Sequence, residues 1–98
     1  MIVEKLQDDV KVTIAKEFAI KEAAELREKA YELIDQGSRS FMMDFSNCEF
    51  IDSSGLGVLV SIYKRCAEKG GTVRILHMKP QVMKIFQLTR LDKVFDIQ

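Results

Sequence analysis

The sequence is poor in the residues on which many enzymes, metal sites and secreted domains depend. It has one histidine, two cysteines, one proline and no tryptophan among 98 residues. Cys48 and Cys66 are too far apart for a Cys-x-x-Cys redox pair, and no second pair is present to hold zinc. We therefore expect two reduced thiols, with Cys66 packed as a small hydrophobe, and neither a metal site nor a cofactor.

An excess of charge of one sign is also absent. The 15 basic and 15 acidic residues give a formal net charge of +0, whereas nucleic-acid binders usually carry a basic excess. No apolar run approaches the ~20 residues that span a bilayer. The N-terminus also lacks the basic and apolar regions of a secretory signal. We expect a cytoplasmic protein with no membrane span that does not bind nucleic acid.

The composition fits one folded domain. Hydrophobic residues make up 47% of the chain and charged residues 31%, which argues against disorder. A chain of this length can build one core. We therefore expect a single domain over residues 1–98.

Strand-like and helix-like patterns alternate along the chain. Strands are predicted at 2–7, 10–15, 41–45 and 72–76, with a hairpin turn at Asp8-Asp9 and a further apolar step at Phe50-Ile51. Helices are predicted at 20–36, at 54–69 and from Pro80 onward. The dense apolar run at 41–45 is typical of a strand buried on both faces. This order predicts an α/β fold with a mixed, mostly parallel sheet of four to five strands covered by helices.

The segment from Asp52 to Gly57, Asp-Ser-Ser-Gly-Leu-Gly, stands between a predicted strand and a predicted helix. The first turn of a helix leaves amides without partners and favours negative charge. Ser53 is a good candidate to cap that turn. Gly55 and Gly57 would leave it bare, so another molecule could approach. A phosphate on Ser53 would add roughly −1.5 to −2 charges there and could block docking without changing the fold.

The helical phase of residues 54–69 adds one candidate contact. Val58 falls on the same side as Ser61 and Arg65, opposite the apolar face that carries Leu59 and Cys66. We therefore expect Val58 to be exposed near Ser53 and to belong to the docking surface.

The residues that a catalytic or nucleotide-binding site would require beside this segment are missing. The phosphate-binding loop, the Rossmann fingerprint and the nucleophile elbow are all absent. The only histidine, His77, follows a predicted strand, where a surface or loop position is expected. We do not expect an enzyme.

The stretch from Phe45 to Leu59 resembles the signature of the STAS family of anti-sigma factor antagonists. Asp44, the Gly70-Gly71 pair and the ending from Leu91 to Phe95 fit the same pattern. The resemblance covers nearly the whole chain and implies a STAS-type sheet covered by helices.

The resemblance also implies a regulatory cycle. The unmodified antagonist binds an anti-sigma factor that is a serine kinase, which frees the sigma factor. The kinase phosphorylates the first serine after the aspartate, here Ser53, and a PP2C-type phosphatase reverses the modification. The partner-binding residues expected from the motif are Asp52, Ser53, Ser54, Gly55, Leu56, Gly57 and Val58.

Two places depart from the family pattern. Many members have Gly-Glu-Leu-Asp after the second strand, where this chain has Lys16-Glu17-Phe18-Ala19, and Arg90 replaces a common glycine. An alternative function is therefore a non-switching STAS module of a lipid-transport or stress-sensing complex.

Overall fold

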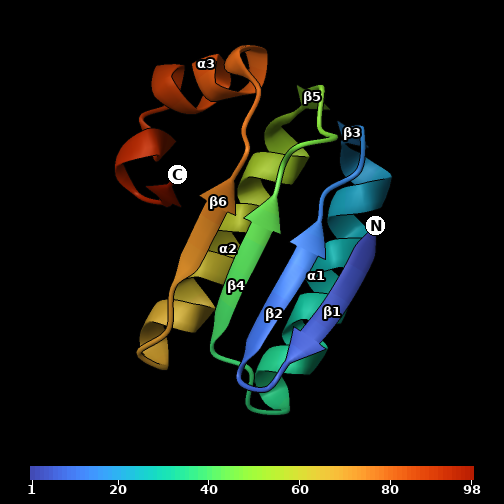
Figure 1. Cartoon of the computed structure of the whole chain (residues 1–98), viewed down its shortest axis with the longest axis vertical. Helices are drawn as coiled ribbons and strands as arrows, with labels where there is room; N and C mark the ends of the chain where they lie inside the picture. Colours follow the sequence, from blue (N-terminus) through green and yellow to red (C-terminus); the bar gives the residue numbers. More distant parts are fainter.

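The main sheet is built from strands that alternate with helices in the sequence. The computed structural model describes residues 1–98 (Figure 1). In spatial order the strands are β1 (Ile2–Leu6), β2 (Asp9–Thr13), β4 (Ser40–Asp44), β6 (Val73–Leu76) and β7 (Asp96–Ile97). β1 is antiparallel to β2, and the other neighbours are parallel. The predicted mixed, mostly parallel sheet is therefore confirmed.

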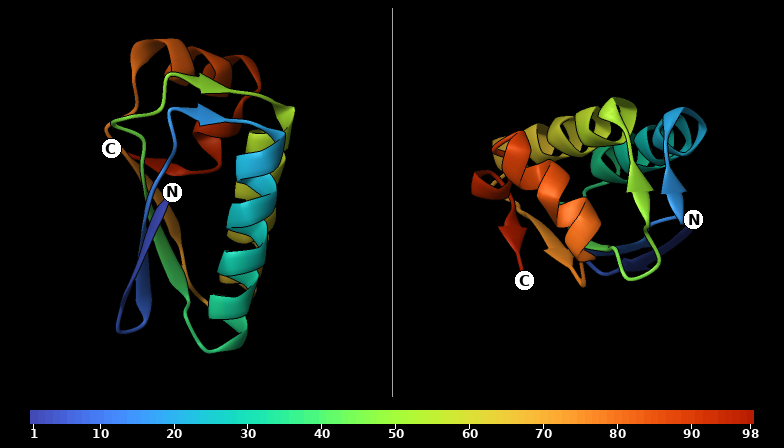
Figure 2. Two further views of the ribbon diagram at one scale, coloured as in Figure 1. Left: turned by 90° about the vertical axis from the view of Figure 1, so that its right-hand side faces the viewer. Right: turned by 90° about the horizontal axis from the view of Figure 1, so that it is seen from above.

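The helices cover one face and one end of this sheet. α1 (Ile20–Asp35) and α2 (Ser53–Glu68) lie side by side on the same face (Figure 2). α3 (Pro80–Leu88), which begins at Pro80 as predicted, lies with the 3-10 helix η1 (Leu91–Lys93) at the end where the parallel strands finish. No helix combines the length and the apolar character that crossing a bilayer requires.

The second face of the sheet carries no helix (Figure 2). On β4, Phe41 and Met43 are buried toward α1 and α2, whereas Met42 and Asp44 on the other face are only half-buried. The prediction that this strand is buried on both faces is therefore wrong. Its apolar density reflects one covered face and one methionine on the open face.

A two-stranded parallel ribbon holds the first turns of α1 and α2 at the same end of the molecule. It consists of β3 (Glu17–Phe18) and β5 (Phe50–Ile51), which directly precede α1 and α2 (Figure 1). The amide of Asp52 also donates to the carbonyl oxygen of Phe18, at 3.4 Å. The start of α2 is therefore fixed by a segment about 35 residues earlier in the chain.

The core is one cluster of 23 buried residues. Within it, edge-to-face contacts link Phe18 to Phe45, Phe45 to Phe86 and Phe86 to Phe95, with ring centroids 6.0 to 6.5 Å apart. Such pairs contribute about 0.5 to 1.5 kcal/mol beyond the area they bury. This chain of rings joins β3 to α3 and to the C-terminal segment.

Candidate functional site

Asp52 caps the first turn of α2. One of its carboxylate oxygens, Oδ1, accepts from the amides of Ser54 at 2.9 Å and Gly55 at 3.1 Å. A helix leaves these first amides without intrahelical partners, and a carboxylate there also complements the helix dipole. The prediction that Ser53 is the cap is wrong, because the helix begins at Ser53 and the preceding aspartate supplies the acceptor.

Ser53 is therefore the first residue of α2 rather than its cap, and it is exposed. Because the carboxylate of Asp52 serves the first-turn amides, the Ser53 hydroxyl is not needed to cap the helix. Ser54, the next residue, is half-buried. Of the two hydroxyls, that of Ser53 is the more accessible to another protein.

The two glycines of this turn do different things. A Cβ atom at Gly55 would lie 2.6 Å from the carbonyl oxygen of Phe18 and 2.8 Å from Cγ1 of Ile51. Gly55 is therefore buried against β3 and β5, and the prediction that it keeps the turn bare for a partner is wrong. A Cβ atom at Gly57 would meet nothing within 4 Å, so the surface is open above Gly57 as predicted.

Val58 is buried, with 6% of its surface exposed. The prediction of an exposed Val58 is wrong because α1 covers the side of α2 that also carries Ser61. The buried stripe of α2 is rotated toward α1, and it consists of Gly55, Val58, Leu59, Ile62 and Cys66. Leu56 is half-buried and packs against the core.

A groove of about 270 Å³ runs between α1 and α2 and begins beside the Ser53 turn. Buried Ala23 and Val58 lie under it, and the lining set is Ile20, Ala23, Ala24, Arg27, Ser54, Gly57, Val58 and Ser61. Nothing in the sequence indicated that the α1 residues of this set line a groove. Ile20, Ala24 and Arg27 follow a helical stripe beside the core stripe, but the pattern does not reveal that α2 lies next to it.

Two large apolar side chains are exposed at the same end of the molecule. Ile20, the first residue of α1, is 73% exposed, and Phe50, in β5, is 52% exposed. The start of α1 and the short strand β5 both lie near the start of α2 (Figure 1). Single exposed apolar residues are common. Ile20 lines the groove together with Ser54, whereas Phe50 lines a separate hollow with Gln81, Val82 and Ile85 of α3.

Two arginines stack on Tyr31 at the interface of α1 and α2. The guanidinium carbon of Arg65 is 3.8 Å from the centroid of the Tyr31 ring, and that of Arg27 is 5.3 Å away. The hydroxyl of Ser61 and the two guanidinium groups lower the pKa of Tyr31, against the opposing effect of burial. Two guanidinium groups therefore lie against one ring at this interface.

The segment that departs from the family pattern lies at the start of α1. Ala19 occupies the N-cap position, where its methyl group cannot accept a hydrogen bond, and only Oε1 of Glu22 accepts from the Ala19 amide, at 3.3 Å. The carbonyl oxygen of Lys16 accepts from the amides of Glu49 at 2.8 Å and Phe50 at 3.2 Å. The segment thus connects the two short strands.

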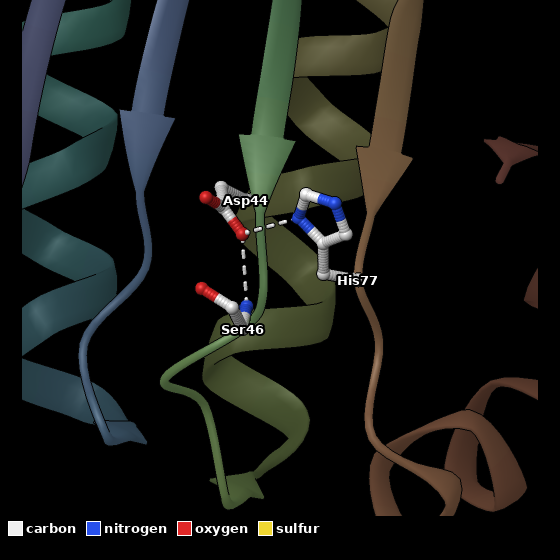
Figure 3. A network of polar contacts seen from close by, with 3 residues as sticks. All are labelled: Asp44, Ser46 and His77. Carbon is white, nitrogen blue, oxygen red and sulfur yellow. Dashed lines mark hydrogen bonds and ion pairs between the residues drawn. The ribbon is translucent and has the colours of Figure 1, made fainter.

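His77 and Asp44 form a polar cluster on the open face, where β4 and β6 end (Figure 3). Oδ1 of Asp44 lies 3.2 Å from Nδ1 of His77 and accepts from the amide of Ser46 at 2.9 Å. Partial burial opposes ionisation, but these two contacts hold the pKa of Asp44 below its ordinary value. The Ser46 hydroxyl points away from His77, so the three residues do not form a nucleophile–base pair. His77 is exposed, as predicted.

Both cysteines are free and buried. Burial raises the pKa of Cys66 to about 11 and also raises the pKa of Cys48. Neither thiol is therefore a reactive thiolate at neutral pH. No three His, Cys, Asp or Glu side chains gather into a group that could hold a metal ion.

Sequence comparison identifies the family pattern over the whole chain. A family model described as the STAS domain matches residues 1–98. The anti-sigma-B factor antagonist of Bacillus subtilis is 30% identical over 95 residues, which cover 97% of this chain and 86% of that protein.

Solved structures share the fold. A crystal structure from Thermotoga maritima superposes with a TM-score of 0.90 at 27% identity, covering 98% of this chain and 83% of that one. The anti-sigma factor antagonist SpoIIAA in its unphosphorylated form superposes with a TM-score of 0.79 at 24% identity, covering 88% of this chain and 80% of that one. The latter likeness concerns the fold alone.

Proposed function

The chain belongs to the STAS family, and on that premise we propose that it is an anti-sigma factor antagonist. In this proposal the unphosphorylated chain binds an anti-sigma factor with serine kinase activity and so releases the sigma factor. Phosphorylation of Ser53 ends the binding, and a PP2C-type phosphatase restores it. The protein acts by docking, without catalysis of its own.

The observation that carries the proposal is the position of Ser53, exposed as the first residue of α2 with Asp52 as the cap. A kinase can reach this hydroxyl without unfolding the helix end. A phosphate there would sit at a helix N-terminus, which tolerates anions. The fold can therefore survive phosphorylation.

Phosphorylation would nevertheless change what a partner meets. Roughly −1.5 to −2 charges would be added beside Asp52, next to the groove that Ser54 and the exposed Ile20 line. A partner that covers this surface would have to desolvate the phosphate, which is costly without a matching cation. Binding is lost while the sheet and helices stay in place.

The test uses purified chain, ATP and each anti-sigma factor kinase encoded by the source organism, with intact-mass analysis. We expect the mass of one phosphoryl group on wild type and on the matched control Ser54→Ala, and none on Ser53→Ala. Ser53→Asp should retain the wild-type circular dichroism spectrum and lose at least about tenfold in affinity for the kinase.

The alternative is a non-switching STAS module of a lipid-transport or stress-sensing complex. The substitution of Ala19 for the usual aspartate at the start of α1 favours it. Under this alternative no kinase modifies Ser53, and Ser53→Asp binds its partner as tightly as wild type does. Either result would contradict the phosphorylation switch.

A further inference from the structure

The groove between α1 and α2 extends the exposed surface beyond the Ser53 turn. It begins at Ser54 and continues past Gly57, above which the surface is open. Ile20 and Ala24 of α1 form its exposed apolar wall. A segment of a protein that docks on Ser53 would therefore continue naturally into this groove.

The groove carries positive charge only, although the formal net charge of the chain is +0. Arg27 is its only charged lining residue, and none of the lining residues is acidic. No carboxylate lies within salt-bridge distance of Arg27, since the one contact of that kind joins His77 to Asp44. Its guanidinium group instead lies 5.3 Å from the ring centroid of Tyr31.

A guanidinium held against a ring still presents its planar fork of donors, which matches a carboxylate in a bidentate geometry. A single arginine in a short apolar groove does not fit a nucleic acid, which needs several phosphate contacts in a row. It fits a protein segment that places one acidic side chain beside apolar ones.

We propose that this groove receives an acidic, otherwise apolar segment of the anti-sigma factor, with a carboxylate paired to Arg27. The inference rests on the proposed function and adds a second contact to it. Docking then has two parts, a turn at Ser53 that must be unphosphorylated and a groove along α1 whose one charged residue is Arg27. The groove contact sets which partner binds, and the Ser53 turn sets whether it binds.

The sign of charge at Ala24 tests the proposal. Ala24 is exposed in the groove wall and sits inside a helix, so both Ala24→Glu and Ala24→Lys should fold. The probe is the purified anti-sigma factor kinase that phosphorylates wild type in the experiment above. We expect Ala24→Glu to weaken binding at least about tenfold and Ala24→Lys to stay within about threefold of wild type. Arg27→Gln should weaken binding and reduce its dependence on salt.

Lys29→Glu is the matched control, since it introduces a carboxylate on α1 at a residue outside the groove. It should bind within about threefold of wild type. Equal loss with Ala24→Glu and Ala24→Lys would mean a neutral occupant and would overturn the acidic segment. No loss with either variant would overturn the groove contact. A dimer of wild type that Ala24→Glu dissociates would show that the occupant is a second copy and would also overturn the proposal.

The two proposals fail differently. If Ser53→Asp abolishes binding while the Ala24 and Arg27 variants bind normally, only the groove inference is wrong. If no anti-sigma factor of the source organism binds wild type, the proposed function fails and the groove inference with it.

Discussion

The carbonyl oxygen of Phe18 lies 2.6 Å from the position that a Cβ atom on Gly55 would occupy. The backbone of β3 therefore packs directly on the first turn of α2. Because Ser53 is two residues before Gly55, this packing also sets where the exposed serine is presented. The glycine of the motif is required by the scaffold, and the serine beside it is available to a partner.

Gly55→Ala should destabilise the fold. The added methyl group must displace backbone of β3, and overpacking of this kind costs about 1 to 3 kcal/mol. The free energy of unfolding in urea measures the loss. Gly57→Ala is the matched control: it has open space and a better helix propensity, so it should gain about 0.5 to 1 kcal/mol. Equal effects of the two variants would show that Gly55 is not packed against β3.

Val58→Glu should unfold much of the protein or lower its free energy of unfolding by several kcal/mol. The substitution places a carboxylate between α1 and α2, where the Val58 side chain is only 6% exposed. Thermal melting followed by circular dichroism measures the change. Val94→Glu, at a position 39% exposed, should shift the melting temperature far less. A Val58→Glu protein as stable as wild type would indicate that Val58 lies on the surface.

Much of the fold was predictable because its signals are local. Gly37 stands directly after the helical pattern of residues 20–36, where a glycine commonly ends a helix. Pro80 starts α3, as a proline in the first turn of a helix does. The alternation of strands with helices implies parallel pairing. The motif at Asp52 to Gly57 was likewise visible, and the structure places its serine on the surface.

What the sequence could not reveal depends on neighbours distant in the chain. Val58 is buried because α1 lies beside it, and helical periodicity alone describes one helix at a time. Gly55 is buried because Phe18 reaches it from β3, a strand of two residues that is too short to show any alternation. The groove was missed for the same reason, since its two walls come from α1 and α2.

Ala19→Asp should stabilise the protein by about 1 kcal/mol, because aspartate at an N-cap position accepts from the free amides of the first turn and complements the helix dipole. Ala19 already has the extended backbone of a cap, with φ −121° and ψ −156°. The melting temperature should rise by about 4 to 8 °C. Ala24→Asp, inside the same helix, should instead lose about 0.7 kcal/mol through helix propensity. An unchanged stability of Ala19→Asp would mean that the α1 amides are already satisfied.

Arg90→Gly should raise stability by up to about 1 kcal/mol. Arg90 has a left-handed backbone with φ 62°. This conformation costs a residue with a side chain about 1 to 2 kcal/mol and costs glycine nothing. The larger freedom of glycine in the unfolded chain offsets part of this gain. Gly37→Ala provides the reverse test, since Gly37 has φ 110° and should lose stability. A destabilised Arg90→Gly protein would indicate that the arginine side chain contributes a contact of its own.

Asp44 should make the fold sensitive to acid. Its pKa is lower in the folded protein than the ordinary 3.8, so the carboxylate stabilises the fold above about pH 4. That contribution disappears as the pH falls through the folded pKa. Asp44→Asn should therefore be less stable than wild type at neutral pH and should lose less further stability on acidification.

Urea denaturation at a series of pH values from neutral to acidic measures this difference. His77→Ala removes one of the two contacts to the carboxylate and keeps the Ser46 amide, so its acid response should lie between those of wild type and Asp44→Asn. If the stability of Asp44→Asn falls as steeply with acidification as that of wild type, another carboxylate carries the acid sensitivity. In that case the cluster at the end of β4 is not a source of stability.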